Sequence, residues 1–402
     1  MSTDFDVLVV GAGIQGAGAA EALTAAGYRV AILEQLEIAA GTSSRSSKLI
    51  HGGLRYLETG QFGLVRECLR ERRWLLANKP GLVRMLPFYI PVYRDSRRPA
   101  WLVRLGLSLY ALLAGVTDRR ARFRALPRSE WDELSGLDTD ELVAVYRYYD
   151  AQTDDAALTR DVVETAVAGG AQLICPGSLV GAELTTDGVR VDYVADGQLN
   201  TLRTRALVNC SGPWVADTNS RCSPAVPLPP LDLVAGSHIL LPISLGERIF
   251  YLEAEDGRAV FVMPWRGETL VGTTERSYGG DPRDLESTLE EESYLLRTIQ
   301  RCFPPTRSLE VHNICHSYAG LRVLPRDSKR PFSRPRETLI CGNRQRRPRI
   351  LAVAGGKLTS YRATARRVVK MLKPTLEGGR GGGGKRTTGN GQAAVSEKER
   401  NL

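Results

Sequence analysis

The spacing of apolar residues predicts a chain that mixes strands with helices. Short apolar runs at Phe5–Val10, Arg29–Leu33 and Ile350–Val353 are typical of buried strands, and the alanine-rich stretch Gly16–Ala26 favours a helix. Helical spacing also predicts helices at Phe62–Asn78, Asp155–Gly169, Ser287–Cys302 and Leu358–Leu372. Further strands are expected at Leu179–Val194, Thr201–Val208, Ile239–Leu241, Arg258–Pro264 and Thr269–Gly272, with turns at Asp187-Gly188 and Asp196-Gly197. The N-terminal order of strand, helix and strand indicates a βαβ unit of an α/β fold.

Two helical stretches carry arginines that bear on their environment. In Phe62–Asn78, an apolar stripe is predicted to face the core, and the arginines are predicted to mark the side in water: Arg66, Arg70, Arg72 and Arg73. The stretch Pro99–Val116 is almost wholly apolar, but Arg104 interrupts it, so it falls short of the roughly 18 to 20 uncharged residues of a spanning helix. With basic flanks at Arg97, Arg98, Arg119 and Arg120, it is expected to lie either in a membrane interface or as a buried cap-domain helix.

Composition narrows the class of protein. The 402 residues are 43% hydrophobic and carry a formal net charge of +9, which suits two or three domains and an acidic ligand or anionic membrane surface. We find no nucleic-acid module, and the seven cysteines, none at CxxC spacing, indicate neither a metal cluster nor a disulfide framework. We read no signal peptide and expect a cytoplasmic protein. The glycine-rich segment 377–402 is predicted to be a disordered tail.

A glycine motif after the first strand predicts a dinucleotide site. In Gly11-Ala-Gly13-Ile14-Gln15-Gly16, the first glycine permits a tight turn, the second lets backbone approach a pyrophosphate, and the third allows close helix packing. The start of the helix then offers N–H groups to phosphates. Glu34, 21 residues after Gly13, is placed to accept hydrogen bonds from ribose hydroxyls. This unit does not separate NAD from FAD.

The run Gly41–Glu58, GTSSRSSKLIHGGLRYLE, concentrates hydroxyls, glycines and cations in 18 residues. Such a run suits a buried anionic ligand, and the alternative is a solvated basic loop.

This run resembles the flavin- and substrate-binding segment of the FAD-dependent glycerol-3-phosphate dehydrogenases, in the D-amino-acid-oxidase-like flavoprotein superfamily. Further segments resemble that family in its order: Val208–Trp214, Gly236–Ile239, Phe261–Trp265, Gly272–Thr274, Ser317–Arg322 and Gly355–Arg362. The resemblance covers about residues 5–372. It departs at Ala235, where the family commonly has a lysine, and after Gly355–Arg362, where a helical domain usually follows.

The resemblance implies a two-domain architecture with FAD as cofactor. A Rossmann-like FAD domain is expected from residues 1–80, 145–225 and 315–375, and a substrate domain with a mixed or antiparallel sheet from 81–144 and 226–314. Besides the glycine motif and Glu34, the implied cofactor contacts are Thr42, Ser43, Ser44, Arg45, Ser46, Ser47, Lys48, Leu49, Gly212, Trp214, Gly356, Lys357, Leu358 and Thr359.

The implied reaction is oxidation of sn-glycerol 3-phosphate to dihydroxyacetone phosphate. Oxidising a secondary alcohol requires a proton acceptor and a hydride acceptor, and FAD takes the hydride at N5. The resemblance implies Arg55 and Arg322 as phosphate ligands, Tyr56 as a substrate contact and Lys357 near flavin or substrate. A histidine suits the base, because its pKa lies near working pH. His51 and His238 lie in matched segments, and each is a candidate for the base. His312 and His316 fit ordinary surface or core residues.

Other interpretations are kept open at this point. The alternative to phosphate binding is that Arg55 forms a salt bridge to Glu58 and that Arg322 forms a structural ion pair. Glu275 and Asp281 are expected to lie on a solvated loop. The resemblance implies that electrons pass to a quinone at the inner face of the membrane, or to oxygen as in the oxidase branch of the family. The alternatives for the whole chain are a related flavin oxidase acting on an amine or another hydroxy acid, and a non-catalytic FAD-binding, membrane-docking protein. The paired histidines and cations argue against the last.

Overall fold

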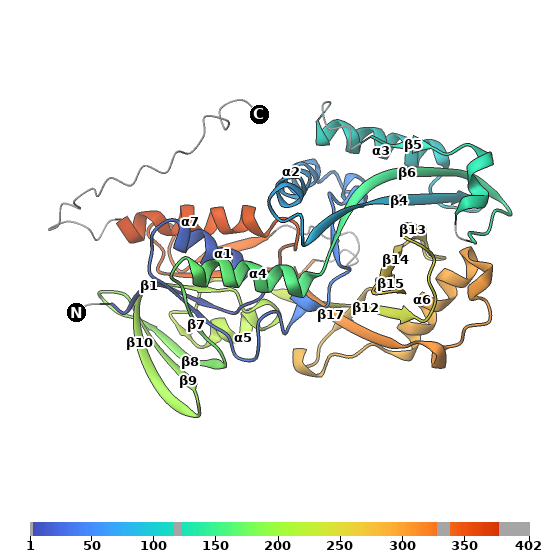
Figure 1. Ribbon diagram of the computed structural model, residues 1–402. Helices are drawn as coiled ribbons and strands as arrows, with labels where there is room; N and C mark the ends of the chain where they lie inside the picture. The colour runs from blue at the N-terminus through green and yellow to red at the C-terminus, as the bar shows by residue number, and fades with distance from the viewer. Residues whose placement is uncertain (1–2, 116–121, 135, 328–337, 378–402) are drawn as a thin grey trace.

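Two sheets lie toward opposite ends of an elongated molecule in the computed structural model, which describes residues 3–115, 122–134, 136–327 and 338–377 (Figure 1). The first sheet runs in the order β11-β8-β9-β10-β1-β2-β7, and β19 pairs with both β10 and β18. Five neighbouring strands run parallel to one another: β1 (Phe5–Val10), β2 (Val30–Leu33), β7 (Gln172–Ile174), β10 (Gln198–Asn209) and β19 (Ile350–Ala354). Its remaining strands are β8 (Gly177–Leu184), β9 (Val189–Ala195), β11 (Cys222–Ser223) and β18 (Leu339–Gly342).

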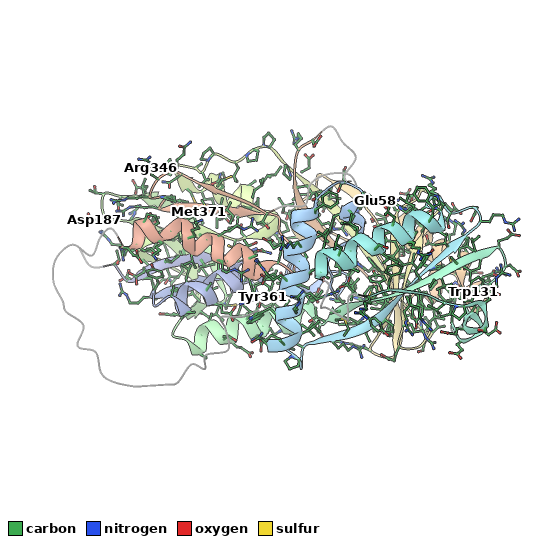
Figure 2. The ribbon with its side chains drawn as sticks, turned by 90° about the horizontal axis from the view of Figure 1, so that it is seen from above. Glu58, Trp131, Asp187, Arg346, Tyr361 and Met371 are labelled. Carbon is green, nitrogen blue, oxygen red and sulfur yellow. The ribbon has the colours of Figure 1, made fainter. Side chains whose placement is uncertain are left out.

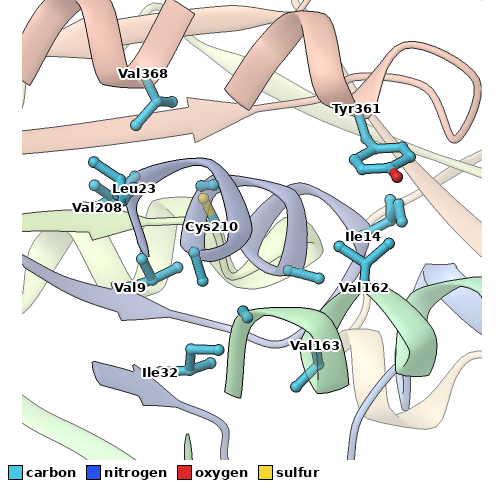
Figure 3. Packing of buried hydrophobic residues seen from close by; sticks show 14 of the residues in the cluster. Val9, Ile14, Leu23, Ile32, Val162, Val163, Val208, Cys210, Tyr361 and Val368 are labelled. Carbon is cyan, nitrogen blue, oxygen red and sulfur yellow. The ribbon is translucent and has the colours of Figure 1, made fainter. Parts of the chain in front are cut away.

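Helix α1 (Ile14–Ala25) lies against the first sheet between α4 (Asp155–Ala168) and α7 (Tyr361–Glu377). Figure 3 shows this packing, in which Leu23 of α1 belongs to one buried cluster with Val162 of α4 and Val368 of α7. The approach of α1 to α7 requires a glycine, because a Cβ at Gly18 would lie 2.5 Å from the ring of Tyr361. The close packing of α1 on α7 therefore depends on the glycine at position 18.

The second sheet runs in the order β16-β12-β15-β14-β13-β4-β6-β3, with β17 on β12 and β5 on β6. Most of its pairs are antiparallel, and the β13–β4 pair is parallel. The strands are β3 (Leu49–Ile50), β4 (Val83–Tyr93), β5 (Arg124–Ala125), β6 (Leu142–Thr153), β12 (Leu231–Leu241), β13 (Ile249–Glu253), β14 (Ala259–Trp265), β15 (Glu268–Gly272), β16 (Arg276–Tyr278) and β17 (His316–Pro325). The predicted α/β class with a second, mixed sheet is confirmed, while the domain boundaries given above stay a prediction.

The sequence pattern missed β4 and β6, two of the longest strands. Pro87 and Pro91 lie within β4, and proline in an apolar run argues against a central strand. Their pairing joins residues about 60 positions apart, and Pro87 stands opposite Tyr149 in the register. Strands stabilised by such distant partners give a weak local signal.

Helix α2 (Phe62–Asn78) has the predicted bounds, but the predicted environment of Arg72 is wrong. Arg66, Arg70 and Arg73 are exposed, whereas Arg72 is fully buried and forms an ion pair with Asp150 of β6. The carboxylate from a distant strand compensates a charge that the helical pattern alone assigns to water. Figure 2 shows α2 in the middle of the molecule, between α7 and α3, with Asp187 and Trp131 at opposite ends.

Helix α3 (Ala100–Ala114) divides its apolar residues between the core and the surface. Leu107 and Tyr110 are buried, whereas Trp101, Leu105 and Leu112 are 67%, 58% and 64% exposed. One face of α3 is therefore buried, as one expectation had it, while the membrane interface stays a prediction for the exposed face. No helix in the described ranges is long and apolar enough to cross a membrane.

α4, α6 (Leu289–Cys302) and α7 agree with the predicted stretches apart from their ends, whereas α5 (Val215–Ser220) was not predicted. α5 follows β10, and α6 begins after Thr288, whose hydroxyl accepts the N–H of Glu291. α7 begins at Tyr361, because residues 355–360 form a loop that includes Gly355 and Gly356 in left-handed conformations. The predicted tail, like Arg119 and Arg120, lies outside the described residues, apart from Glu377 at the end of α7.

Candidate functional site

One cleft of about 350 Å³ lies where the first sheet meets the second. The carboxyl ends of β1 and β2 form one wall, and residues of β12 and β17 form another. In open α/β sheets, ligands bind outside the carboxyl ends of parallel strands, so the cleft has the expected position for a dinucleotide. All but three of the predicted site residues line it, the exceptions being Gly16, Ser44 and Lys48.

The glycine turn has the conformation that its sequence predicts. Gly11 has a φ of +102°, and a Cβ there would lie 2.7 Å from the carbonyl oxygen of Cys210. A Cβ at Gly16 would lie 1.9 Å from the carbonyl oxygen of Gly11, so Gly16 permits close packing and does not face the cleft. The N–H of Ile14, the first residue of α1, donates to Ser43 Oγ at 2.9 Å.

Glu34 at the end of β2 shapes the adjoining part of the cleft. One carboxylate oxygen accepts the N–H of Ala12 at 2.7 Å, and the other accepts the N–H of Leu36 at 2.9 Å. A carboxylate offers about four acceptor sites, which leaves capacity for ribose hydroxyls. The start of α1, which lines the cleft beside this carboxylate, fits the pyrophosphate and ribose of a dinucleotide such as FAD.

The run Gly41–Glu58 is mostly buried or half-buried, so it is not a solvated loop. Thr42 donates to the carbonyl of Leu321, and the N–H of Ser46 donates to Asp155 of α4. Lys48 Nζ lies 2.6 Å from Asp155 Oδ1 and also donates to the carbonyl of Ser44. Lys48 is therefore directed at α4, away from the cleft that the neighbouring Ser46 and Ser47 line.

The segment before α7 meets residues that are more than 300 positions away in the sequence. The side-chain amide of Gln15 donates to the carbonyl of Lys357 at 3.2 Å, and Thr359 Oγ1 accepts the N–H of His51 at 3.2 Å. Gly356 has a φ of +102°, and a Cβ there would lie 2.8 Å from the Gln15 side chain. Lys357 Nζ lies 3.4 Å from the centre of the Tyr56 ring, a cation–π contact.

Both predicted histidines lie at the cleft, in different environments. His238 on β12 is buried, stacks on Tyr318 of β17 with ring centres 4.9 Å apart, and has Nε2 2.8 Å from Ser47 Oγ. Its Nδ1 is buried with no hydrogen-bond partner among the described residues. Burial, and then the charges of Arg322 and Lys48, hold the pKa of His238 well below its ordinary value, so its ring is neutral near pH 7.

The other histidines differ in exposure. His51 follows β3, and its ring lies edge-on to Phe261 of β14 at 6.2 Å. His312 and His316 are exposed on the surface, as expected.

Arg55 of the short helix η2 (Leu54–Leu57) and Arg322 of β17 meet at one carboxylate. Glu275 Oε1 lies 3.7 Å from Arg55 Nη2 and 3.5 Å from Arg322 Nη1. The interpretation of Glu275 as a solvated loop residue is wrong, because its side chain is only 6% exposed. The alternative prediction of a salt bridge from Arg55 to Glu58 is also wrong, because Glu58 pairs with Arg98. The alternative ion pair of Arg322 does form, and its partner is Glu275. Arg322 also lines the cleft.

Sequence reasoning missed several side chains that complete the cleft. Thr273 accepts a hydrogen bond from Arg322 Nη2 at 3.0 Å, and Tyr251 and Phe261 form an edge-to-face pair in the wall. Thr273 stood inside the matched segment Gly272–Thr274, with Glu275 next to it, so position offered a signal. The contacts of Thr273 and Glu275 are made with Arg322 and Arg55, which lie far from them in the sequence, so the local pattern could not show these contacts.

Comparisons with known proteins agree with this geometry. The sequence profile described as "DAO: FAD dependent oxidoreductase" matches residues 6–362. The chain is 39% identical to a glycerol-3-phosphate dehydrogenase of Pseudomonas aeruginosa, over 92% of this chain and 72% of that protein. It is 35% identical to a D-erythritol 1-phosphate dehydrogenase of Brucella abortus, over 92% and 73%. The solved glycerol-3-phosphate dehydrogenase from Bacillus halodurans, complexed with FAD, is 26% identical with a TM-score of 0.73; the match covers 93% of this chain, which spans 65% of that one.

The position of Glu34 predicts its effect on cofactor affinity. We expect Glu34→Ala to raise the Kd for FAD by roughly tenfold or more, because a hydrogen bond to a charged group contributes about 1.5–3 kcal/mol. Glu34→Gln, which keeps an acceptor for a backbone N–H, should lose less. Flavin fluorescence titration of the apoprotein measures Kd, with the exposed neighbour variant Glu37→Ala as control. An unchanged Kd in Glu34→Ala would contradict the assignment.

Proposed function

Because the chain belongs to the DAO family of FAD-dependent oxidoreductases, we propose that it oxidises sn-glycerol 3-phosphate to dihydroxyacetone phosphate. The observation that carries the proposal is the convergence of Arg55 and Arg322 in the cleft that also holds His51 and His238. Two relatives support it by name, one a glycerol-3-phosphate and one a D-erythritol 1-phosphate dehydrogenase. Both names describe a phosphate ester of a polyol, which needs cations for the phosphate and a base for the hydroxyl.

The binding roles follow from charge and position. Bound FAD supplies the acceptor for the hydride that leaves the alcohol carbon. Arg55 and Arg322 bind the phosphate, for which the guanidinium fork is suited, and Lys357 is a further cation that lines the cleft. Tyr56, whose ring underlies Lys357, orients the substrate beside it. The glycine turn, Glu34, the serine run and residues 356–359 hold FAD.

The histidines take the proton of the substrate hydroxyl. His238 is neutral near pH 7 and its ring is held by Tyr318 and Ser47, so its orientation is fixed. His51 is held through its backbone by Thr359 and lies in the same cleft. We assign the proton-accepting role to one histidine of this pair, because both line the cleft and an unprotonated imidazole nitrogen can accept a proton.

Anaerobic mixing tests the reaction directly. Glycerol 3-phosphate should bleach the flavin absorbance, D-erythritol 1-phosphate should do so more slowly, and glycerol should have little effect. Reoxidation by a soluble quinone faster than by oxygen would support a quinone as the natural acceptor. A flavin that stays oxidised with glycerol 3-phosphate but is reduced by an amine or a hydroxy acid would favour a related oxidase instead.

Removing Arg322 should separate substrate binding from folding. We expect Arg322→Ala to raise KM for glycerol 3-phosphate by roughly tenfold to a hundredfold, because it removes a charged contact to the phosphate. The slow rate with plain glycerol should barely change, and FAD should stay bound. A lower melting temperature with equal damage to both substrates would assign Arg322 to a structural ion pair.

We also propose that the protein binds the inner face of the membrane through α3, where it reaches a quinone. Trp101, Leu105 and Leu112 expose apolar surface on this helix, and Arg104 is exposed among them. An amphipathic helix with basic residues lies in the interfacial plane of an anionic bilayer. The net charge of +9 favours the same surface.

Vesicle flotation tests this attachment. The protein should float with vesicles that contain an anionic phospholipid, and added salt should weaken the binding by screening. The double variant Trp101→Ser/Leu105→Ser should stay in the soluble fraction. Equal recovery of the unaltered protein with and without vesicles at low salt would contradict the proposal.

A further inference from the structure

Glu275 differs from the other carboxylates near the cleft, because one of its oxygens faces two arginines that belong to distant segments. Oε1 lies within 3.7 Å of both guanidiniums, yet Glu275 is not among the residues that line the cleft, whereas Arg55 and Arg322 are. The carboxylate therefore lies behind the guanidinium groups that the proposed function assigns to phosphate binding.

The loop that carries Glu275 is fixed from both sides. The N–H of Ser237 donates to Thr274 Oγ1 at 2.8 Å, and that hydroxyl donates to Glu291. Arg258 donates to the backbone carbonyl of Glu275 at 3.2 Å. The carboxylate is held in position by this loop.

Arg55 and Arg322 also have contacts that do not involve Glu275. Arg322 donates to Thr273 Oγ1, and the guanidinium of Arg55 lies 5.5 Å from the centre of the Tyr56 ring. Glu275 is therefore one of several contacts that hold the two arginines. Its negative charge also acts on an anion that the arginines bind.

The charges at the cleft show what that effect is. Arg55, Arg322 and Lys357 are among the cations that line the cleft, and Glu275 places one negative charge behind the first two. A phosphate dianion bound to the guanidiniums is repelled by this carboxylate. At a separation of about 6 Å, even the dielectric constant of water leaves a repulsion that corresponds to roughly tenfold in affinity.

We propose that Glu275 tunes the phosphate subsite, weakening the binding of every phosphate so that inorganic phosphate alone does not fill it. This inference rests on the proposed function, which supplies the substrate whose hydroxyls make further contacts. A phosphate ester with hydroxyls then binds through both sets of contacts, whereas a free anion has only the weakened one. Glu275 sets the affinity of the phosphate subsite and acts through Arg55 and Arg322.

Calorimetric titration of the FAD-loaded protein with inorganic phosphate tests the proposal without turnover. Glu275→Gln, which keeps the shape and removes the charge, should bind phosphate roughly tenfold more tightly. Glu275→Asp, which keeps the charge and shortens the side chain, should stay near the unaltered affinity. Glu253→Gln removes a carboxylate from the Arg98 pair outside the cleft, so it matches the change in net charge and should leave the Kd unchanged.

Measuring the melting temperature with and without phosphate tests the proposal even if Glu275→Gln or Glu275→Ala is less stable than the unaltered protein. Phosphate stabilises the folded state in proportion to its binding, so Glu275→Gln and Glu275→Ala should gain more from added phosphate than the unaltered protein does. Weaker phosphate binding in Glu275→Gln, or neutral variants that stay unfolded in saturating phosphate, would overturn the proposal and assign Glu275 to holding the arginines. Because these measurements use inorganic phosphate, they stand whether or not glycerol 3-phosphate reduces the flavin.

Discussion

The buried ion pair between Lys48 and Asp155 is the contact on which the rest of the site depends. The two side chains are 7% and 0% exposed, and Asp155 also accepts the N–H of Ser46. Asp155 begins α4, directly after β6, so this pair ties the serine-rich run to the junction of the two sheets. Breaking such a pair leaves an uncompensated buried charge, which is why the run keeps one conformation.

From this anchor the run reaches both halves of the cleft. Ser43 accepts the N–H that opens α1, and Ser47 contacts His238 on the second sheet. The chain then continues through His51, held by Thr359, to Arg55 beside Glu275. One segment thus sets the spacing between the dinucleotide wall and the proposed catalytic wall, and a shift of its anchor would move both.

The second sheet contributes through its register more than through local sequence. β12 and β17 pair antiparallel with His238 opposite Tyr318, so the ring stacking follows from strand pairing. The same pairing sets Arg322 four residues further along β17, near the loop of Thr273 and Glu275. The buried, neutral histidine and the position of Arg322 therefore both follow from one antiparallel pair of strands that lie about 80 residues apart in the chain.

The sequence by itself determined the features whose signal is local. Apolar runs and a glycine turn specify the β1-α1-β2 unit, the place of Glu34 and the helix at Phe62–Asn78, because backbone conformation and periodicity depend on near neighbours. All but three of the site residues that the sequence identified also line the cleft, through motifs that each lie within a few positions. The tertiary structure alone decided that Lys48 faces Asp155, that Arg72 is buried against Asp150, and that Glu275 lies behind two arginines. The energy of a charged side chain depends on its partner and on burial, and here each partner comes from a segment far away in the chain.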